Sequence, residues 1–215
     1  MKQQNEPARF GIVVYPGVEP IDLGATAGAI SMARRVLPAI ECVIIAAKPG
    51  PIELAGGVSI IAAAGFDAHP VCDIYIVCGG PGWEQQVLDS AMLAFLRRLP
   101  EGSVASVCTG GLILAAAGVL AGRQATTRRH PVGKEASAPL ARLVQICSSV
   151  RPIAAAVCDD HGVVTSGGVS LAIDGTLYLI GRLYGRAAQG EVARVIEYER
   201  SFEANRAALG HAIAR

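Results

Sequence analysis

Residues 104–117, VASVCTGGLILAAA, decide the fold of this 215-residue chain. A short apolar run, typical of a buried strand, leads to Cys108. The small residues Thr109, Gly110 and Gly111 come next, and an apolar helix begins directly after them. This layout is that of a nucleophile elbow, in which a strand presents one reactive side chain on a sharp turn before a helix. The stretch therefore predicts an α/β fold in which Cys108 is the candidate nucleophile.

The same alternation of strands and helices extends to both sides of this stretch. We predict buried strands at residues 10–16, 40–50, 73–82 and 103–111, hairpins at 51–66 and 153–168, and a further strand at 144–149. We predict helices at residues 21–36, 83–100, 112–122, 134–144, 169–185 and 191–215. Such alternation favours βαβ units and a mainly parallel sheet flanked by helices on both faces. Because no linker or internal repeat interrupts it, residues 1–215 are expected to form a single domain.

Composition and charge argue against several classes of function. The formal net charge is +1, and the longest basic run is the pair Arg128-Arg129, so no basic face for nucleic acid is expected. Gly, Pro or charged residues break every apolar stretch before the roughly 18 residues that a membrane span needs. The first ten residues, MKQQNEPARF, lack the apolar core of a signal peptide, which predicts a cytoplasmic protein. Its six cysteines contain no CxxC pair, so reduced thiols and no metal site are expected.

Three predicted strands end in loops that are suited to hold a ligand. The first ends at YPGVEPIDLGA, a middle one at the Gly79-Gly80 turn of CGGPG, and a third at Cys108. If these strands are neighbours, their carboxyl ends form one site. There the start of a helix would favour the Cys108 thiolate. The backbone N–H groups of Thr109 and Gly80 would then point at an oxyanion beside the sulfur.

Other interpretations of these residues remain open. A cysteine at a strand end usually serves packing, and Cys78 is the only other one placed to lie near the same sheet edge. A nucleophilic cysteine normally needs a base or acid partner. His130 could approach the site, whereas the other histidines are interpreted as loop or surface residues: His69, His161 and His211. A histidine-based triad is therefore poorly supported.

Four motifs together resemble the DJ-1/PfpI (ThiJ) superfamily. They are PGVEPIDLGA, IVCGGPG, VCTGGLILAAAGVLAGRQATT and VVTSGGVSLAID, and the resemblance runs in order from about residue 10 to about residue 200. It implies a flavodoxin-like fold of the class I glutamine amidotransferase type. Within the superfamily the chain is most similar to isocyanide hydratases and to the sensor-like domains of some AraC-type regulators. The resemblance also implies a homodimer and no cofactor.

The resemblance to isocyanide hydratases gives Cys108 an acidic partner. The residue that matches their catalytic acid is Asp22, and Gly80 and Thr109 match the residues that line the oxyanion position. Burial and a neighbouring thiolate would raise the pKa of Asp22, so that it could protonate an isocyanide carbon while the thiolate attacks. Asp22 could instead be an ordinary carboxylate at the start of a helix, and Glu19 is a competing acid in the same loop.

One segment departs from the hydratase pattern. Where hydratases tend to have Ala-Thr-Thr-His-Trp, this chain has Arg128 and Arg129 after Ala-Thr-Thr. Two arginines would make the pocket cationic if both line it, although a solvated surface is the commoner place for such a pair. Three functions stay open: hydration of a small electrophile, ligand or redox sensing without turnover, and a glyoxalase- or chaperone-like stress role. In each case the expected partner is a small molecule. The chain leaves no room for a helix-turn-helix domain, so a free-standing relative or a sensor domain is expected.

Overall fold

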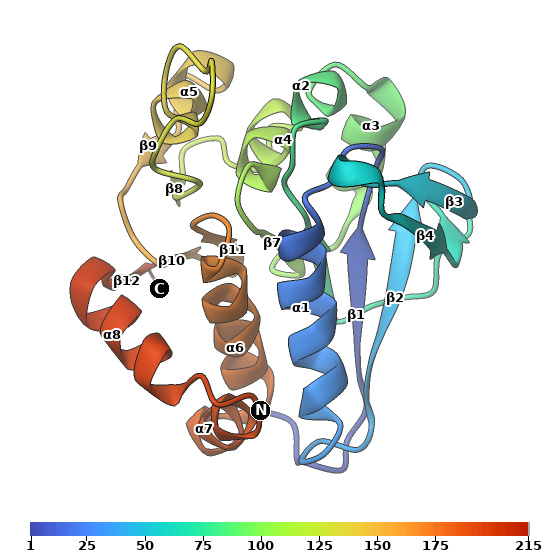
Figure 1. The fold of residues 1–215 in the computed structure, drawn as a ribbon, viewed down its shortest axis with the longest axis vertical. Helices are drawn as coiled ribbons and strands as arrows, with labels where there is room; N and C mark the ends of the chain where they lie inside the picture. Colours follow the sequence, from blue (N-terminus) through green and yellow to red (C-terminus); the bar gives the residue numbers. More distant parts are fainter. Residues whose placement is uncertain (215) are drawn as a thin grey trace.

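The computed structural model describes residues 1–214, and a central sheet organises them (Figure 1). The sheet has the strand order β12-β10-β11-β7-β6-β1-β2-β5. Neighbouring strands pair in parallel except for β10 and β11, which form an antiparallel hairpin. Its strands are β1 (Ala8–Val13), β2 (Ile40–Ala46), β5 (Ala64–Gly65), β6 (Ile74–Val77), β7 (Val104–Ser106), β10 (Val157–Asp160), β11 (Val163–Ser166) and β12 (His211–Ala214).

Helices pack on both faces of this sheet, as the sequence predicted. On one face α1 (Pro20–Ala33), α6 (Leu171–Tyr184) and α7 (Arg186–Val195) contact one another, and α8 (Glu199–Leu209) packs beside α6 and α7. On the other face α4 (Gly110–Ala116) contacts α2 (Trp83–Gln86), α3 (Ser90–Arg98) and α5 (Pro139–Ile146). The predicted α/β class, with a mainly parallel sheet between two helical layers, is therefore confirmed. That residues 1–215 are a single domain stays a prediction.

The interior strands β1 and β6 are mainly apolar because helices cover both faces of the sheet. Every residue of β6 and β7 is buried, and Phe10, Ile12 and Ile76 are fully excluded from solvent. The residues after β1, β6 and β7 lie at one edge because these strands are direct neighbours in the order β7-β6-β1. This confirms the assumption on which the predicted convergence of the three loops rested.

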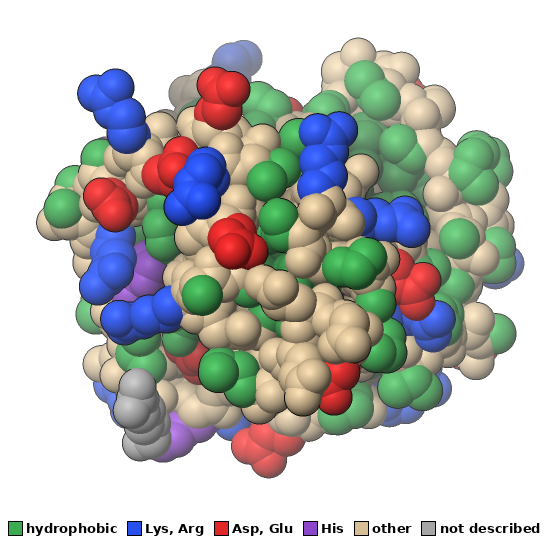
Figure 2. Space-filling view, turned by 90° about the horizontal axis from the view of Figure 1, so that it is seen from below, with side chains coloured by type: hydrophobic (Ala, Val, Ile, Leu, Met, Phe, Trp, Pro, Cys, Tyr) green, Lys and Arg blue, Asp and Glu red, His purple; other side chains and the backbone are tan. Residues whose placement is uncertain are grey.

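Small strand pairs complete the architecture. The predicted hairpin at residues 51–66 is formed by β3 (Gly50–Glu53) and β4 (Ser59–Ala62), with a short 3-10 turn, η1 (Ala55–Gly57), between them. The strands β8 (Gln124–Ala125) and β9 (Arg151–Pro152) pair in parallel outside the main sheet. On the face drawn in Figure 2, Lys and Arg side chains are interspersed with Asp and Glu, as the near-zero net charge implies.

Three predicted elements are wrong in type or in the number of elements that they contain. The strand at residues 144–149 is absent, because Val144 to Ile146 continue α5, which Pro139 begins and Cys147 ends. Short apolar runs do not distinguish a strand from a helix by periodicity alone. The helix predicted at 83–100 is divided into α2 and α3, because the Asp89 carboxylate accepts hydrogen bonds from Ala91 N (2.8 Å) and Met92 N (3.0 Å) and caps a new helix.

The third correction concerns the single helix predicted at 191–215. The structure has the end of α7, then α8, and then strand β12, which Gly210 separates from α8 with φ of 73°. β12 pairs in parallel with β10 and covers an edge that would otherwise leave backbone groups of β10 unpaired. Arg215, the last residue of the predicted helix, lies outside the described residues. Among residues 1–214 there is no helix with the length and apolar character needed to cross a membrane.

Candidate active site

Cys108 occupies the tight turn that the sequence predicted between β7 and α4. Its φ of 51° lies in the left-handed region, which is unusual for a residue other than glycine. Two hydrogen bonds hold this backbone: Cys108 N donates to Gly167 O (3.2 Å), and Thr127 Oγ1 donates to Cys108 O (2.6 Å). Strained backbone that is fixed in this way is a common feature of functional sites. The predicted elbow geometry is therefore present.

The helix after Cys108 starts so close to β6 that only glycine fits there. A Cβ atom on Gly110 would lie 2.2 Å from the carbonyl oxygen of Val77. Real Cβ contacts do not come so near, so any other residue would push α4 away from the sheet. This close approach brings the turn of Cys108 and Thr109 against the loop that follows β6.

Asp22 lies in the first turn of α1, and its carboxyl group is completely buried. Oδ2 accepts a hydrogen bond from Gly79 N (2.9 Å), whereas Oδ1 is buried without a hydrogen-bond partner among the described residues. The carboxyl does not cap α1, whose N-cap residue is Glu19 and has no side-chain cap. Asp22 therefore lies at the start of a helix, as one alternative expected, but its carboxyl does not serve as a cap.

The carboxyl of Asp22 and the thiol of Cys108 interact directly. Burial raises the pKa of Asp22 to about 7, although hydrogen bonds from Gly79 N and from Cys108 oppose this effect. Burial and the Asp22 charge raise the pKa of the Cys108 thiol to about 12, against the lowering effect of the Thr109 N–H. The expected direction for Asp22 is confirmed, and the expected thiolate-favouring effect of the α4 start is outweighed by desolvation. The two groups are coupled, and the pair loses its two protons in separate steps.

The two predicted oxyanion donors differ in what they contact. The backbone N–H of Thr109 interacts with the Cys108 sulfur, as the elbow requires. The backbone N–H of Gly80 instead donates to Thr109 Oγ1 at 2.9 Å, so in this structure it is engaged by the hydroxyl rather than directed at the sulfur. Gly79 contributes through Asp22, to which its N–H donates. The sequence could not show this arrangement because it depends on one side-chain rotamer.

A cavity of about 280 Å³ opens beside Cys108. Its wall brings together the loops after β1, β6 and β7 with the segment after β8 and the start of α6. The lining residues are Glu19, Gly80, Pro81, Trp83, Cys108, Thr109, Arg128, Val132, Glu135 and Val169. Trp83, Val132, Glu135 and Val169 were not named from the sequence as site residues, because nothing in their local pattern distinguishes them from packing or surface positions.

Arg128 lines this cavity but does not make it strongly cationic. Its guanidinium donates to Glu135 Oε1 and to the carbonyl oxygen of His130, and the ion pair with Glu135 is largely shielded from solvent. Arg129 is not among the residues that line the cavity. Of the alternatives left open for the two arginines, a cationic pocket lined by both does not describe the structure, because Arg128 is paired with Glu135 and Arg129 lies outside the lining.

The other residues that were considered from the sequence do not line the cavity beside Cys108. His69 packs edge-on against Tyr75 and Phe95, and His161 sits in an exposed turn with φ of 49°. His130 is exposed and contributes only its carbonyl oxygen to Arg128. Cys78 is buried near the site, since both Asp22 and Cys108 raise the pKa of its thiol. Within residues 1–214 no group of three His, Cys, Asp or Glu side chains is arranged to hold a metal ion.

Comparisons with known proteins agree with this architecture. A structure of a ThiJ/PfpI family protein from Pseudomonas syringae superposes with a TM-score of 0.77 at 25% identity, over 91% of this chain and 77% of that chain. An isonitrile hydratase from Pseudomonas putida is 28% identical over 192 residues, which are 88% of this chain and 78% of the relative. The HTH-type transcriptional regulator GbdR from Pseudomonas aeruginosa is 30% identical over 145 residues, which are 67% of this chain and 37% of the regulator.

The family itself follows from a match to a family profile. The profile of the DJ-1/PfpI family covers residues 8–180, a range that runs from β1 through most of α6 and includes both Asp22 and Cys108. With the predicted elbow and the flavodoxin-like sheet also in place, the chain belongs to the DJ-1/PfpI family.

Proposed function

We propose that this chain is a cysteine-dependent lyase that hydrates a small isocyanide to an N-formamide, with Cys108 as nucleophile and Asp22 as proton donor. The observation that carries the proposal is the buried Asp22 carboxyl next to Cys108, with one oxygen bonded to Gly79 N and the other without a partner. A buried polar atom without a partner is costly. Oδ1 is therefore suited to hold a proton beside Cys108, which lines the cavity.

The coupled pair supplies both reagents that the reaction needs. When the pair holds one proton, the thiol, whose pKa is about 12, keeps it, and transfer of this proton to Asp22 as the substrate binds would leave the thiolate on Cys108. The thiolate attacks the isocyanide carbon while Asp22 protonates the same carbon, which forms a thioimidate. Water then adds to the thioimidate carbon, the C–S bond breaks, and the N-formamide leaves with the thiol restored. The net reaction is isocyanide plus water to N-formamide, with no oxidant or reductant.

The cavity fits a small and mainly apolar substrate. A volume of about 280 Å³ lies near the lower end of typical ligand pockets. Pro81, Trp83 and Val169 give it apolar walls, and Glu135 balances the charge of Arg128. The similarity to an isonitrile hydratase supports the same substrate class.

A ligand-sensing role is the second candidate. The similarity to the regulator GbdR supports it, and so does the raised pKa of Cys108, because a buried neutral thiol is a poor nucleophile on its own. A sensor would bind a small molecule in the same cavity without turnover. In either case we propose that the partner is a small molecule; the homodimer implied by the resemblance stays a prediction, which sedimentation equilibrium tests.

Turnover of phenyl isocyanide separates the two roles. The purified protein should produce N-phenylformamide over many turnovers, and Cys108→Ala should abolish the product. Cys42→Ser, at an exposed thiol far from the elbow in sequence, is the matched control and should keep full activity. Product formation by Cys108→Ala would contradict the proposal, and ligand binding without product in the wild type would favour the sensor.

A further inference from the structure

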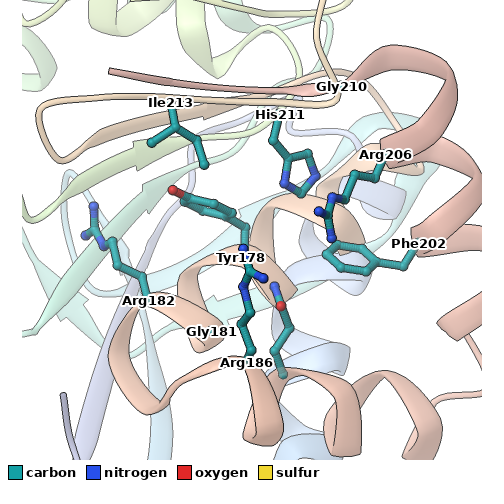
Figure 3. A pocket seen from close by; sticks show the side chains of 10 residues that line it. Tyr178, Gly181, Arg182, Arg186, Phe202, Arg206, Gly210, His211 and Ile213 are labelled. Carbon is teal, nitrogen blue, oxygen red and sulfur yellow. The ribbon is translucent and has the colours of Figure 1, made fainter. Parts of the chain in front are cut away.

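A second cavity, the C-terminal cavity, lies between α6, α7, α8 and β12. Its volume is about 470 Å³, larger than the cavity at Cys108, and the two share no lining residue. Figure 3 shows side chains entering it from all four elements. The lining residues are Tyr178, Gly181, Arg182, Arg186, Gln189, Phe202, Arg206, Gly210, His211 and Ile213.

Three arginines line this cavity, one each from α6, α7 and α8. Among the described residues, only the one from α6, Arg182, has hydrogen-bond partners. Arg182 donates to Gly162 O (2.7 Å) and Gly102 O (2.8 Å). The side chains of Arg186 and Arg206 make no hydrogen bond or ion pair with any residue in the range 1–214. Two guanidinium groups that lack internal partners and border one hollow are a chemical match for an anion.

Asp159, which is hydrogen-bonded to Tyr178 in the wall of the cavity, already accepts hydrogen bonds from other donors. Asp159 Oδ2 accepts from Tyr178 Oη (2.8 Å), and Asp159 Oδ1 accepts from Gly162 N (2.9 Å). Arg182 Nη1 lies 3.9 Å from the same carboxylate. Asp159 therefore links α6 to the β10–β11 turn. It forms no ion pair with Arg186 or Arg206.

His211 adds an unpaired polar atom to the same wall. The sequence suggested a surface residue in the terminal tail, which is wrong: Nε2 is buried and has no hydrogen-bond partner among residues 1–214. The ring is fixed edge-on against Tyr178, with centroids 5.6 Å apart, and against Phe202 at 5.7 Å. Figure 3 shows the ring close to the side chain of Arg206. An Nε2–H here is positioned to donate to a ligand oxygen.

We propose that the C-terminal cavity is a binding site for a small organic anion, separate from the site at Cys108. Arg186 and Arg206 would bind its carboxylate or phosphate oxygens, with the His211 ring as a further donor. The aromatic side chains of Phe202 and Tyr178 would contact the apolar part of the ligand. The C-terminal cavity should therefore favour a ligand in which an oxyanion is joined to an apolar group. Inorganic anions should bind more weakly, because they make no apolar contact with Phe202 and Tyr178. This proposal does not depend on the function proposed for Cys108.

Calorimetric titration at low salt tests it with phenyl phosphate, benzoate and inorganic phosphate as probes. We expect saturable one-site binding of phenyl phosphate or benzoate, weaker binding of inorganic phosphate, and about a tenfold loss of affinity in Arg206→Gln. Arg200→Gln is the matched control, because Arg200 is exposed on the same helix and does not line the cavity. Comparison of the first two probes shows whether the oxyanion is a phosphate or a carboxylate.

A second pair of variants separates this site from the Cys108 cavity. Cys108→Ala should bind the probe as the wild type does, whereas His211→Phe, which keeps a ring between Tyr178 and Phe202, should bind it several-fold more weakly. The proposal is overturned if Arg206→Gln and Arg200→Gln bind equally well. It is also overturned if binding is lost in Cys108→Ala, or if no probe saturates the folded wild type below about 10 mM, weaker than ordinary ligand affinities.

Discussion

Burial and the Asp22 charge raise the pKa of the Cys108 thiol, and the two residues follow β1 and β7: Asp22 lies in the first turn of α1 and Cys108 in the turn after β7. β6 lies between these strands, and its following loop supplies the N–H of Gly79 that holds Asp22 Oδ2 at 2.9 Å. The relationship therefore joins all three strand ends. The central feature of the site is therefore the coupled ionisation of Asp22 and Cys108.

Removal of the acid should slow turnover without unfolding the protein. Asp22→Asn keeps the shape of the side chain but cannot deliver a proton, so we expect kcat/KM for phenyl isocyanide to fall by about 10²- to 10⁴-fold. Glu19→Gln, which changes the competing acid that also lines the cavity, should reduce it far less. Steady-state kinetics on variants with unchanged circular dichroism provides the measurement. Equal losses in both variants would remove the specific role of Asp22.

The same carboxyl should make stability depend on pH. Its pKa is raised to about 7, so between about pH 4 and pH 7 the native state keeps a proton that the unfolded chain has released. Stability therefore falls as pH rises through this window. The free energy of unfolding of Asp22→Asn should exceed that of the wild type above pH 7 by about 4 kcal/mol at most, and the difference should shrink toward pH 4.

Urea unfolding of both proteins at several pH values measures this difference. Comparison of the two cancels the similar contribution of Asp174, whose pKa burial raises to about 6. A constant difference across the whole pH range would show that Asp22 is ionised in the native protein throughout.

Much of this arrangement could be predicted from the sequence, because it depends on local patterns. Apolar runs ended by Gly or Pro gave the buried strands, and the strand, small residues and helix around Cys108 gave the elbow. Asp22 came from a resemblance, since nothing in its own neighbourhood distinguishes it from a helix-start carboxylate. The engagement of Gly80 N–H by Thr109 Oγ1 depends on a rotamer, and the pairing of Arg128 with Glu135 depends on a loop conformation. Neither leaves a periodic signal. The division of the C-terminal segment into α7, α8 and β12 depends on an open edge at β10, which is a tertiary effect.

The hydroxyl of Thr109 should matter for stability because it satisfies the buried N–H of Gly80 at 2.9 Å. Thr109→Val keeps the volume but leaves that donor unpaired, which should cost about 1–3 kcal/mol of unfolding free energy. Thr109→Ser retains the hydroxyl and should lose clearly less. Chemical denaturation of both variants measures the difference. If the serine variant is as destabilised as the valine variant, the hydrogen bond to Gly80 is not the cause.

The ion pair of Arg128 and Glu135 should set the charge preference of the Cys108 cavity. Glu135→Gln leaves the Arg128 guanidinium without its counter-charge, so we expect KM for 4-isocyanobenzoate to fall several-fold relative to phenyl isocyanide. Arg128→Met should move the preference toward the neutral substrate. Arg129→Met is the matched control, because Arg129 does not line the cavity. A preference that changes equally in Arg129→Met would show a general effect of net charge.

The pH dependence of Cys108 alkylation by iodoacetamide tests the coupling between Asp22 and Cys108 most directly. Burial and the Asp22 charge raise the pKa of the Cys108 thiol to about 12, so the alkylation rate of the wild type should rise only in alkaline solution. In Asp22→Asn the rise should move to a lower pH, because the carboxylate charge that opposes ionisation of the thiol is removed. Mass spectrometry of the Cys108 peptide gives the rate at this thiol alone. A rise at the same pH in both proteins, or one at a higher pH in Asp22→Asn, would contradict the account.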